Sequence, residues 1–428
     1  NHPPTPEIYT SDVSSAASDV YKRQGCKRMK IAVIGTGISG NVAAYHLSQN
    51  HDVTVFEANG YVGGHTHTHD IEWAGRHYAV DTGFIVFNEK TYPNFIGLLD
   101  RLGVAVRPTK MSFSVKNERT GLEYNGHSLN TLFAQRGNVF SLSFHRMLQD
   151  ILRFNRDALR SLPDGRSDIG LGDFLKQGGY GRMFIEQYIV PMGAAIWSTD
   201  PERMQHFPAR FFVRFLHHHG LLSISDRPQW YVVDGGSREY LRPLIRGFED
   251  RIRLNSPVES VRRFATHVEV TPRHRPTERF DAVFIAAHSD QALTMLEDPS
   301  PLEREVLGAI RYQENEAVLH TDHSILPARR RAWAAWNYHI RNEPGERVAV
   351  TYNMNILQGL DAPVQFCVTL NNSRAVKPRS IIDRITYHHP LYTPETVAAQ
   401  NRQREINGIN NTFYCGAYWR NGFHEDGV

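Results

Sequence analysis

The stretch KIAVIGTGISGNVAAYHL, residues 30–47, constrains the fold more than any other part of this chain of 428 residues. The apolar run IAVI precedes three glycines in GxGxxG spacing, Gly35, Gly37 and Gly40, and a helical pattern follows. In such a unit the first glycine permits a tight turn, the second lets the backbone approach a phosphate, and the third lets the helix pack on the strand. The helix then points free N–H groups at the phosphates. We therefore predict an α/β fold that binds a dinucleotide.

A second predicted strand, DVTVFEA, carries Glu57 twenty residues after Gly37. An acidic side chain at this point accepts hydrogen bonds from the ribose hydroxyls of adenosine, and it disfavours the 2′-phosphate of NADP. This leaves NAD and FAD as candidates. A second glycine turn, Gly63-Gly64, follows closely, and a plain NAD-binding domain does not require one. This turn favours FAD.

Longer motifs carry a family resemblance. They are EANGYVGGHTH, VDTGFIVFN (80–88), TYPN (91–94), MSFSV (111–115), GAAIWS (193–198), RPQWYVV (227–233) and YCGAYW (414–419). On these motifs, from Met29 to Val428, the chain resembles the superfamily of flavin-containing amine oxidases and phytoene desaturases. Within it, the chain is most similar to stand-alone bacterial FAD-dependent oxidoreductases and to the amino-terminal flavoprotein half of plant cyclopropane fatty acid synthases. The resemblance implies FAD and an amine oxidase-like α/β flavoprotein, with a Rossmann-like FAD-binding domain and an interleaved α+β substrate domain.

The resemblance also implies a discontinuous domain arrangement. The FAD-binding domain is expected to comprise residues 29–100, 226–295 and 400–428, and the substrate domain residues 101–225 and 296–399. The segments RIRLNSPVESVRRFATHVEVTPR and FDAVFIAA have strand patterns and are expected to return to the FAD-binding sheet. EAVLHTD, RVAVTYNM and VQFCVTL predict a mixed sheet, which the helical stretch FHRMLQDILRFNRDALRSL helps to cover.

The two ends of the chain stand apart from this pattern. Residues 1–28 have no periodic apolar pattern, and we expect a non-native or disordered leader there. The final string, GFHEDGV, breaks off within a motif of the superfamily. We expect a chain extended by further helix to hold FAD more tightly.

The predicted cofactor contacts follow from the glycine motif and from the resemblance. The resemblance places the Gly63-Gly64 turn near the FAD pyrophosphate, the DTGF segment beside the isoalloxazine ring, and the final strand along the ribityl chain. Asp81 in DTGF is expected only to cap a turn. The full set of predicted FAD contacts is Gly35, Gly37, Ile38, Ser39, Gly40, Glu57, Ala58, Gly63, Gly64, His65, Thr66, Gly83, Phe84, Val258, Gly416, Asp426 and Gly427.

Four aromatic residues, Trp197, Trp230, Tyr231 and Tyr418, are candidates for a substrate cavity. Ordinary aromatic core packing explains each of them equally well, because apolar cavities and cores use the same side chains. No catalytic base is identified.

Clustered histidines raise the question of a metal site. His65, His67 and His69 alternate, a layout that a strand could turn toward a metal, whereas His217, His218 and His219 would fan around a helix. No carboxylate or cysteine is visibly paired with the first set, the second set cannot converge on one ion, and no metal is expected.

Composition narrows the class of protein. Lysine and arginine number 48 against 45 aspartates and glutamates, so the net charge of +3 gives no reason to expect nucleic acid as a partner. The three cysteines, Cys26, Cys367 and Cys415, lie far apart and fit a reducing compartment. No apolar run reaches the roughly 18 residues of a membrane span. We expect a cytoplasmic protein that contacts the inner membrane at most peripherally and transiently.

The leading functional hypothesis is an FAD-dependent oxidoreductase that removes hydride from a hydrophobic substrate, a fatty acyl chain or lipid, by desaturation or oxidation. Oxygen is one candidate electron acceptor. An amine or polyene oxidase of the same fold is the first alternative. A non-catalytic FAD-binding partner of a lipid methyltransferase is the second. An NAD-dependent dehydrogenase is disfavoured by Gly63-Gly64 and by the terminal strand.

Overall fold

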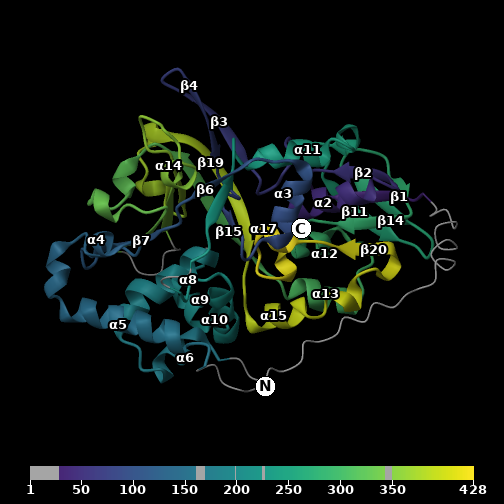
Figure 1. Ribbon diagram of the computed structural model, residues 1–428. Coiled ribbons are helices and arrows are strands. Elements are labelled where there is room, and N and C mark those ends of the chain that lie inside the picture. The colour runs from purple at the N-terminus through teal and green to yellow at the C-terminus, as the bar shows by residue number, and fades with distance from the viewer. Residues whose placement is uncertain (1–27, 161–168, 198, 224–226, 343–348) are drawn as a thin grey trace, which may run out of the picture.

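A five-stranded parallel sheet forms around the strand that begins the glycine motif (Figure 1). This is a computed structural model that describes residues 28–160, 169–197, 199–223, 227–342 and 349–428. The sheet has the order β10-β2-β1-β14-β20, and its strands are β10 (Ile252–Arg253), β2 (Asp52–Phe56), β1 (Lys30–Ile34), β14 (Ala282–Ile285) and β20 (Thr412–Tyr414). Helix α2 (Ile38–Leu47) connects β1 to β2, as the glycine motif predicts.

Burial explains why these short segments form a parallel sheet. Ile31 to Ile34 are all buried, and so are all but one of the residues of β14. Parallel strands are covered on both faces, so they consist of continuous apolar runs. The sheet takes strands from all three segments that the sequence analysis assigns to an FAD-binding domain, but the domain boundaries themselves stay a prediction.

One sequence prediction needs correction here. Only Ile252–Arg253 and β14 join the parallel sheet, whereas the residues between them form a separate antiparallel sheet. Its strands are β11 (Val258–Arg263), β12 (Val268–Pro272) and β13 (Glu278–Phe280). Its middle strand alternates buried and half-buried residues, the pattern of a strand that packs on one face. A buried ion pair between Arg263 and Glu303 ties this sheet to helix α13 (Pro301–Gly308).

A seven-stranded mixed sheet forms the second large layer, as predicted from three of its strands. Its order is β19-β15-β18-β17-β16-β7-β8, antiparallel except for the parallel pair β16 and β7. The strands are β19 (Ile381–Pro390), β15 (Tyr312–His320), β18 (Cys367–Leu370), β17 (Ala349–Asn353), β16 (Trp336–Ile340), β7 (Phe113–Asn117) and β8 (Glu123–Asn125).

A group of helices packs against one end of the seven-stranded sheet. Ala194 and Ala195 of α8 contact Tyr338 and Val350 of the sheet, so the helical segment covers it there. Phe144, Met147 and Phe154 of α5 point into the helical core, so one side of this helix is buried. The group comprises α4 (Leu129–Leu132), the 3-10 helix η1 (Arg136–Phe140), α5 (Leu142–Asp157), α6 (Leu171–Gln177), α7 (Arg182–Phe184), the π-helical turn η2 (Ile185–Ile189), α8 (Val190–Trp197), α9 (Pro201–His206) and α10 (Ala209–His218).

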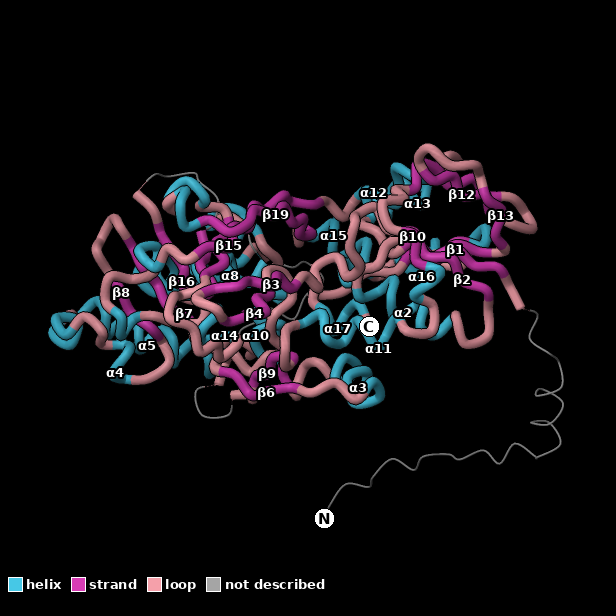
Figure 2. Tube along the Cα trace, turned by 90° about the horizontal axis from the view of Figure 1, so that it is seen from above, coloured by secondary structure: helices cyan, strands magenta, loops and turns pink. Residues whose placement is uncertain are grey.

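Smaller elements complete the fold. Figures 1 and 2 both place α4 and α5 at the opposite end of the molecule from β1 and β2, with α17 between them. These elements are the hairpin β3 (Thr68–Trp73) and β4 (Arg76–Asp81), the sheet of β5 (Phe87–Asn88), β9 (Trp230–Val233) and β6 (Val106–Thr109), and the helices α3 (Pro93–Leu102), η3 (Ser237–Tyr240), α11 (Leu241–Ile245), α14 (Met354–Leu357) and α17 (His424–Gly427). Helices α12 (Ser289–Met295), α15 (Pro394–Gln400) and α16 (Gln403–Ile406) flank the parallel sheet.

Two further findings concern the chain as a whole. Within the described ranges, no helix combines the length and the apolar character that a membrane crossing requires. Residues 1–27 of the expected leader, Cys26 among them, lie outside the described residues, as do Ser198 of the GAAIWS motif and the predicted domain boundary at 225 and 226.

Candidate functional site

The first glycine turn has the geometry of a phosphate-binding turn. The N–H of Gly35 donates to the carbonyl of Phe56 at 2.8 Å, which fixes the turn to the end of β2. A Cβ on Gly40 would overlap the carbonyl of Gly35, so only glycine permits the close approach of α2 to β1. By contrast, no atom lies within 4 Å of the position that a Cβ on Gly37 would take. No side chain caps the amino end of α2, so its N–H groups stay available to an anion.

Glu57 lies at the carboxyl end of β2, where the motif predicts it. Its buried carboxylate accepts hydrogen bonds from the backbone N–H of Thr36 at 2.9 Å and of Asn59 at 2.8 Å. The N–H of Ser256 donates to the Glu57 carbonyl at 2.8 Å, and this bond brings the segment leading to Val258 beside the acid. The carboxylate is therefore oriented by backbone groups from both sides.

The second glycine turn lies against the first. A Cβ on Gly64 would be 3.2 Å from the Cα of Gly37. The N–H of Phe84 donates to the carbonyl of His65 at 2.7 Å, and a Cβ on Gly83 would overlap that carbonyl. Four stretches of predicted cofactor residues thus lie together: both glycine turns, the end of β2, and the Gly83-Phe84 segment.

The carboxyl-terminal segment completes this group. A Cβ on Gly427 would lie 2.5 Å from Cγ2 of Ile38 and 2.9 Å from Oγ of Ser39, so α17 packs directly on the start of α2. A Cβ on Gly416 would overlap the ring of Tyr418. The side chain of Asp426 accepts a hydrogen bond from the N–H of Phe423 at 2.9 Å, which caps α17.

Two residues that the sequence prediction missed lie at the centre of this region. The imidazole of His424 stacks on Phe84 with ring centroids 3.6 Å apart, and its Nε2 lies 2.7 Å from Oη of Tyr240 and 3.2 Å from Oγ1 of Thr66. Burial lowers the pKa of His424 well below its usual value, so the ring is neutral. The two residues lie in the sequence segments GFHEDGV and DGGSREYLRPL, next to glycine and acidic residues.

Asp81 does more than cap a turn. Its buried carboxylate accepts hydrogen bonds from the backbone N–H of Ser237 at 3.0 Å and from Nε2 of Gln358 at 2.9 Å, and Thr68 adds a third through its hydroxyl. Burial raises the pKa of Asp81 to about 6, so the carboxyl is ionised at neutral pH. It joins β4 to η3 and α14 directly beside Gly83.

Two uncharged ring side chains on β19, Tyr387 and His389, face the second glycine turn, and we call them the aromatic wall. Asn315 of β15 lies beside them. The ring of His65 stacks on Tyr387 with centroids 4.8 Å apart and lies 5.5 Å from the ring of His389. Nδ2 of Asn315 is 3.1 Å from Nδ1 of His389.

The histidines at the aromatic wall are neutral. Burial, and then the nearby His288 and His388, lower the pKa of His65 to about 4. Burial, and then His65 and His388, lower the pKa of His389 to about 3. The Nε2 atom of His65 is buried without a hydrogen-bond partner in the described protein. Such an atom indicates a group that belongs there in addition to the protein.

The four aromatic candidates for a substrate cavity do not lie together. Trp197 packs in the helical core, with centroids 4.6 Å from both Phe207 and Phe215. Tyr231 stacks on Phe87, and Trp230 lies beside it on β9. Tyr418 belongs to the core of the parallel sheet. Trp197, Tyr231 and Tyr418 thus pack in three different hydrophobic clusters, and the role of these residues in a substrate cavity stays a prediction.

The histidines do not form a metal cluster in the part of the chain that the structure describes. No group of three or more histidine, cysteine, aspartate or glutamate side chains there is placed to hold a metal ion. The rings of His67 and His69 lie 4.3 Å apart, and Nδ1 of His69 is 3.4 Å from the carboxylate of Asp383.

Comparison with known proteins decides the family. The profile of the flavin containing amine oxidoreductase family matches residues 38–333. The protein belongs to this family. It is an FAD-dependent oxidoreductase, and FAD is its cofactor.

Solved structures share the fold over nearly the whole chain. A CLA-producing fatty acid isomerase from P. acnes has a TM-score of 0.65 at 16% identity, covering 93% of this chain and 96% of that one. Cyclohexylamine oxidase from Brevibacterium oxydans IH-35A has a TM-score of 0.65 at 15% identity, covering 94% and 96%. Tryptophan 2-monooxygenase from Allorhizobium ampelinum is 58% identical over 45 residues, which are 10% of this chain and 6% of that protein.

The residues present fit FAD. The uncapped start of α2 with open space at Gly37 suits a diphosphate, and the oriented carboxylate of Glu57 suits a ribose. Buried polar atoms without a protein partner, Nε2 of His65 and Oη of Tyr418, add hydrogen-bonding groups that the described protein leaves unused. The donor set and the acceptor set that FAD requires are therefore both present.

Proposed function

We propose that this FAD-dependent oxidoreductase removes a hydride from an acyl chain of a lipid. The observation that carries the proposal is the uncharged character of the aromatic wall. No described carboxylate forms an ion pair or a hydrogen bond with His65, Tyr387 or His389, and both imidazoles are neutral. An acyl methylene needs no counter-charge, whereas an ammonium group without a partner is costly to bury. The wall therefore suits an acyl chain better than a cationic amine.

The comparisons support the proposal without separating it from the amine alternative. The fatty acid isomerase and the cyclohexylamine oxidase are equally similar to this chain in fold, with the same TM-score. The resemblance to the flavoprotein half of plant cyclopropane fatty acid synthases adds weight to a lipid. The chemistry of the wall is what favours the acyl chain.

We assign the FAD contacts to the residues that the structure brings together. The start of α2 and the second glycine turn would hold the pyrophosphate, and Glu57 would hold the adenosine ribose. Thr66, Tyr240 and His424 would line the part of the cofactor site around Phe84. Bound FAD would supply the acceptor for one hydride, which carries two electrons. The carboxylate of Asp81 keeps Gly83 in place through its bonds to Ser237 and Gln358.

The chain's own residues then position the substrate. Removal of a hydride from one carbon of an acyl chain leaves a proton to be lost from the next. That proton passes to solvent, because the imidazoles of His65 and His389, with a pKa of about 4 and about 3, are weak bases at neutral pH. Positioning at a near-attack distance carries most of the remaining rate enhancement.

Anaerobic reduction of the bound flavin tests the proposal. The purified holoprotein is mixed without oxygen with phospholipids, free fatty acids, primary amines or polyenes, and the visible absorbance is followed. We expect bleaching by acyl substrates and none by amines. Bleaching by amines alone would contradict the acyl proposal. Bleaching by acyl chains only in the presence of a lipid methyltransferase would favour a supporting role instead.

A pair of variants on β19 sharpens this test. His389→Asp places a carboxylate on the aromatic wall, and we expect acyl-driven bleaching to slow by at least about tenfold, because a buried charge disfavours apolar chains. Thr386→Asp is the matched control, since residue 386 is exposed and alternates to the other face of the strand. Equal bleaching rates for both variants would show that the wall does not contact the substrate.

A further inference from the structure

The exposed apolar side chains of this protein are concentrated in one short segment. Large hydrophobic residues with high exposure occur at ten described positions, and six of these lie between residues 129 and 159. Leu129 is 76% exposed, Phe140 87% and Leu142 86%. Single exposed hydrophobic residues are normal on a protein surface, but a cluster of them marks an interaction site. The other members of the cluster are Val139, Leu152 and Leu159.

This segment is well anchored and not loosely folded. Helix α5 buries Phe144, Met147 and Phe154 in the helical core, which leaves its opposite side free. Leu142 and Leu152 lie on that free side, and Leu159 continues it just beyond the helix. We call α4, η1 and the free side of α5 the docking face.

The docking face is basic as well as apolar. Residues 127–160 contain five arginines against two aspartates. Of these, Arg136, Arg146, Arg156 and Arg160 are exposed, while neither aspartate is. Asp150 and Asp157 are already paired with arginines of the same helix. The face therefore presents positive charge around its apolar side chains.

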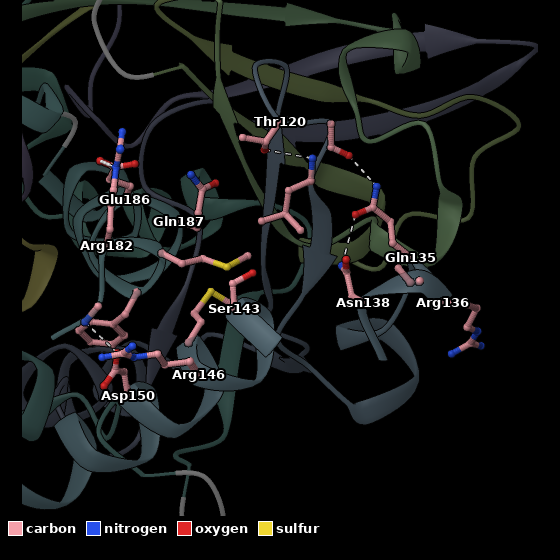
Figure 3. A pocket seen from close by; sticks show the side chains of 18 of the residues that line it. Thr120, Gln135, Arg136, Asn138, Ser143, Arg146, Asp150, Arg182, Glu186 and Gln187 are labelled. Atoms are coloured by element: carbon pink, nitrogen blue, oxygen red, sulfur yellow. Dashed lines mark hydrogen bonds and ion pairs between the residues drawn. The ribbon is translucent and has the colours of Figure 1, made fainter. Parts of the chain in front are cut away.

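A cavity adjoins the docking face. It has a volume of about 1280 Å³ and lies between η1 and α5 on one side and α7 and η2 on the other (Figure 3). Arg136 and Arg146 line it, and neither forms an ion pair with any described residue. Figure 3 shows Arg136 extending away from Gln135 and Asn138. Guanidinium groups without carboxylate partners are suited to phosphate oxygens.

The position of the docking face allows a flat surface to reach it. Both views place α4 and α5 at the end of the molecule, far from the parallel sheet (Figures 1 and 2). A protein partner would have to be apolar and acidic over the same area. A bilayer with anionic headgroups offers both, because its negative headgroups lie directly above its apolar acyl chains. Basic amphipathic helices with exposed aliphatic and aromatic residues lie in such interfaces.

We propose that the docking face binds the surface of an anionic phospholipid bilayer. Phe140 and Leu142 insert among the acyl chains, and Arg136 and Arg146 contact headgroup phosphates at the mouth of the cavity. The inference does not depend on the proposed substrate, because it concerns a surface remote from the flavin turns.

Vesicle binding of the holoprotein tests the proposal without any turnover. Sedimentation is measured with vesicles of phosphatidylcholine alone and of phosphatidylcholine with phosphatidylglycerol. We expect binding to the anionic vesicles and little to the neutral ones. Phe140→Ser with Leu142→Ser is expected to lower the partition coefficient by at least about tenfold. Arg136→Gln and Arg146→Gln are each expected to lower it about fivefold, on anionic vesicles only.

Matched controls separate the docking face from general surface effects. Ile409→Ser removes a side chain that is 52% exposed elsewhere, and Arg275→Gln removes an exposed arginine outside the segment. Both controls should bind anionic vesicles like the unchanged protein, and all variants should keep their visible flavin spectrum. Equal binding to both vesicle types, binding unaffected by the docking-face variants, or a change in oligomeric state without vesicle binding would each overturn the proposal.

Discussion

Replacement of Gly83 by alanine is the sharpest test of how the candidate site is built. The new Cβ would overlap the carbonyl oxygen of His65 and lie 2.9 Å from its carbonyl carbon and 3.1 Å from its Cα. All three atoms belong to the backbone, so no side-chain rotation relieves the overlap. Either the end of β4 or the second glycine turn must move, which breaks the 2.7 Å bond from the N–H of Phe84 to His65.

The expected cost follows from these two losses. Overpacking of this kind costs about 1–3 kcal/mol, and the lost hydrogen bond adds about 1 kcal/mol. Because the second glycine turn is part of the assigned FAD site, this cost should appear as a Kd for FAD raised roughly 30- to 1,000-fold. Titration of the deflavinated protein with FAD, followed by flavin fluorescence, measures it.

Gly97→Ala is the matched control. Gly97 is exposed in the middle of α3, and no atom lies within 4 Å of the position of its Cβ. Alanine should stabilise that helix by about 0.5–1 kcal/mol and leave the Kd for FAD unchanged. The reasoning would be refuted if Gly83→Ala bound FAD as tightly as the unchanged protein, or if Gly97→Ala weakened binding to the same degree.

Three further predictions concern stability and the cofactor. Burial acts to raise the pKa of Glu303, but hydrogen bonds from Arg263 and Tyr414 outweigh it and lower the pKa to about 2. The stability that this lowered pKa contributes to the folded protein is present above about pH 4.5 and is lost as the pH falls toward 2. Urea unfolding across that range should show the loss, and Glu303→Gln should be less stable at neutral pH by on the order of 3 kcal/mol with a flatter pH profile. Glu57→Gln should raise the Kd for FAD about tenfold, since it weakens charge-assisted hydrogen bonds to the ribose. Titration of the deflavinated variant with FAD measures this, and an unchanged Kd would show that Glu57 does not bind the cofactor. Glu425 accepts bonds from two N–H groups at the start of α3, so Glu425→Ala should lower the free energy of unfolding by about 1 kcal/mol, and no change in thermal denaturation would contradict this role.

Local patterns predicted the parts of the fold that depend on neighbouring residues. The strand, glycine turn and helix at residues 30–47 lie where the spacing predicts them, because each glycine has a steric reason that acts within a few residues. The two glycine turns and Gly83 also lie together as expected. Their roles in binding FAD stay a prediction that the titrations above address.

Long-range packing was beyond the sequence patterns. Periodicity indicates that Trp197 and Tyr418 are buried, but it does not say against what, and the structure places them in different clusters. The carboxylate of Asp81 accepts a hydrogen bond from the N–H of Ser237, 156 residues later in the sequence, and no local pattern predicts such a contact. The exposure of Phe140 and Leu142 is likewise invisible in a sequence where both look like core residues.

The strand order of the parallel sheet has a consequence for the synthesis of the protein. Strand β1 pairs with β2 soon after both leave the ribosome, but its other neighbour, β14, follows about 250 residues later, and β20 closes the sheet only near residue 414. At ~5–20 residues per second, β20 emerges roughly 20–80 s after β1. During that interval β1 exposes an apolar edge that other strands can pair with. The nascent chain therefore exposes this edge over most of its elongation, and the residues of the candidate FAD site are all present only after α17 has been synthesised.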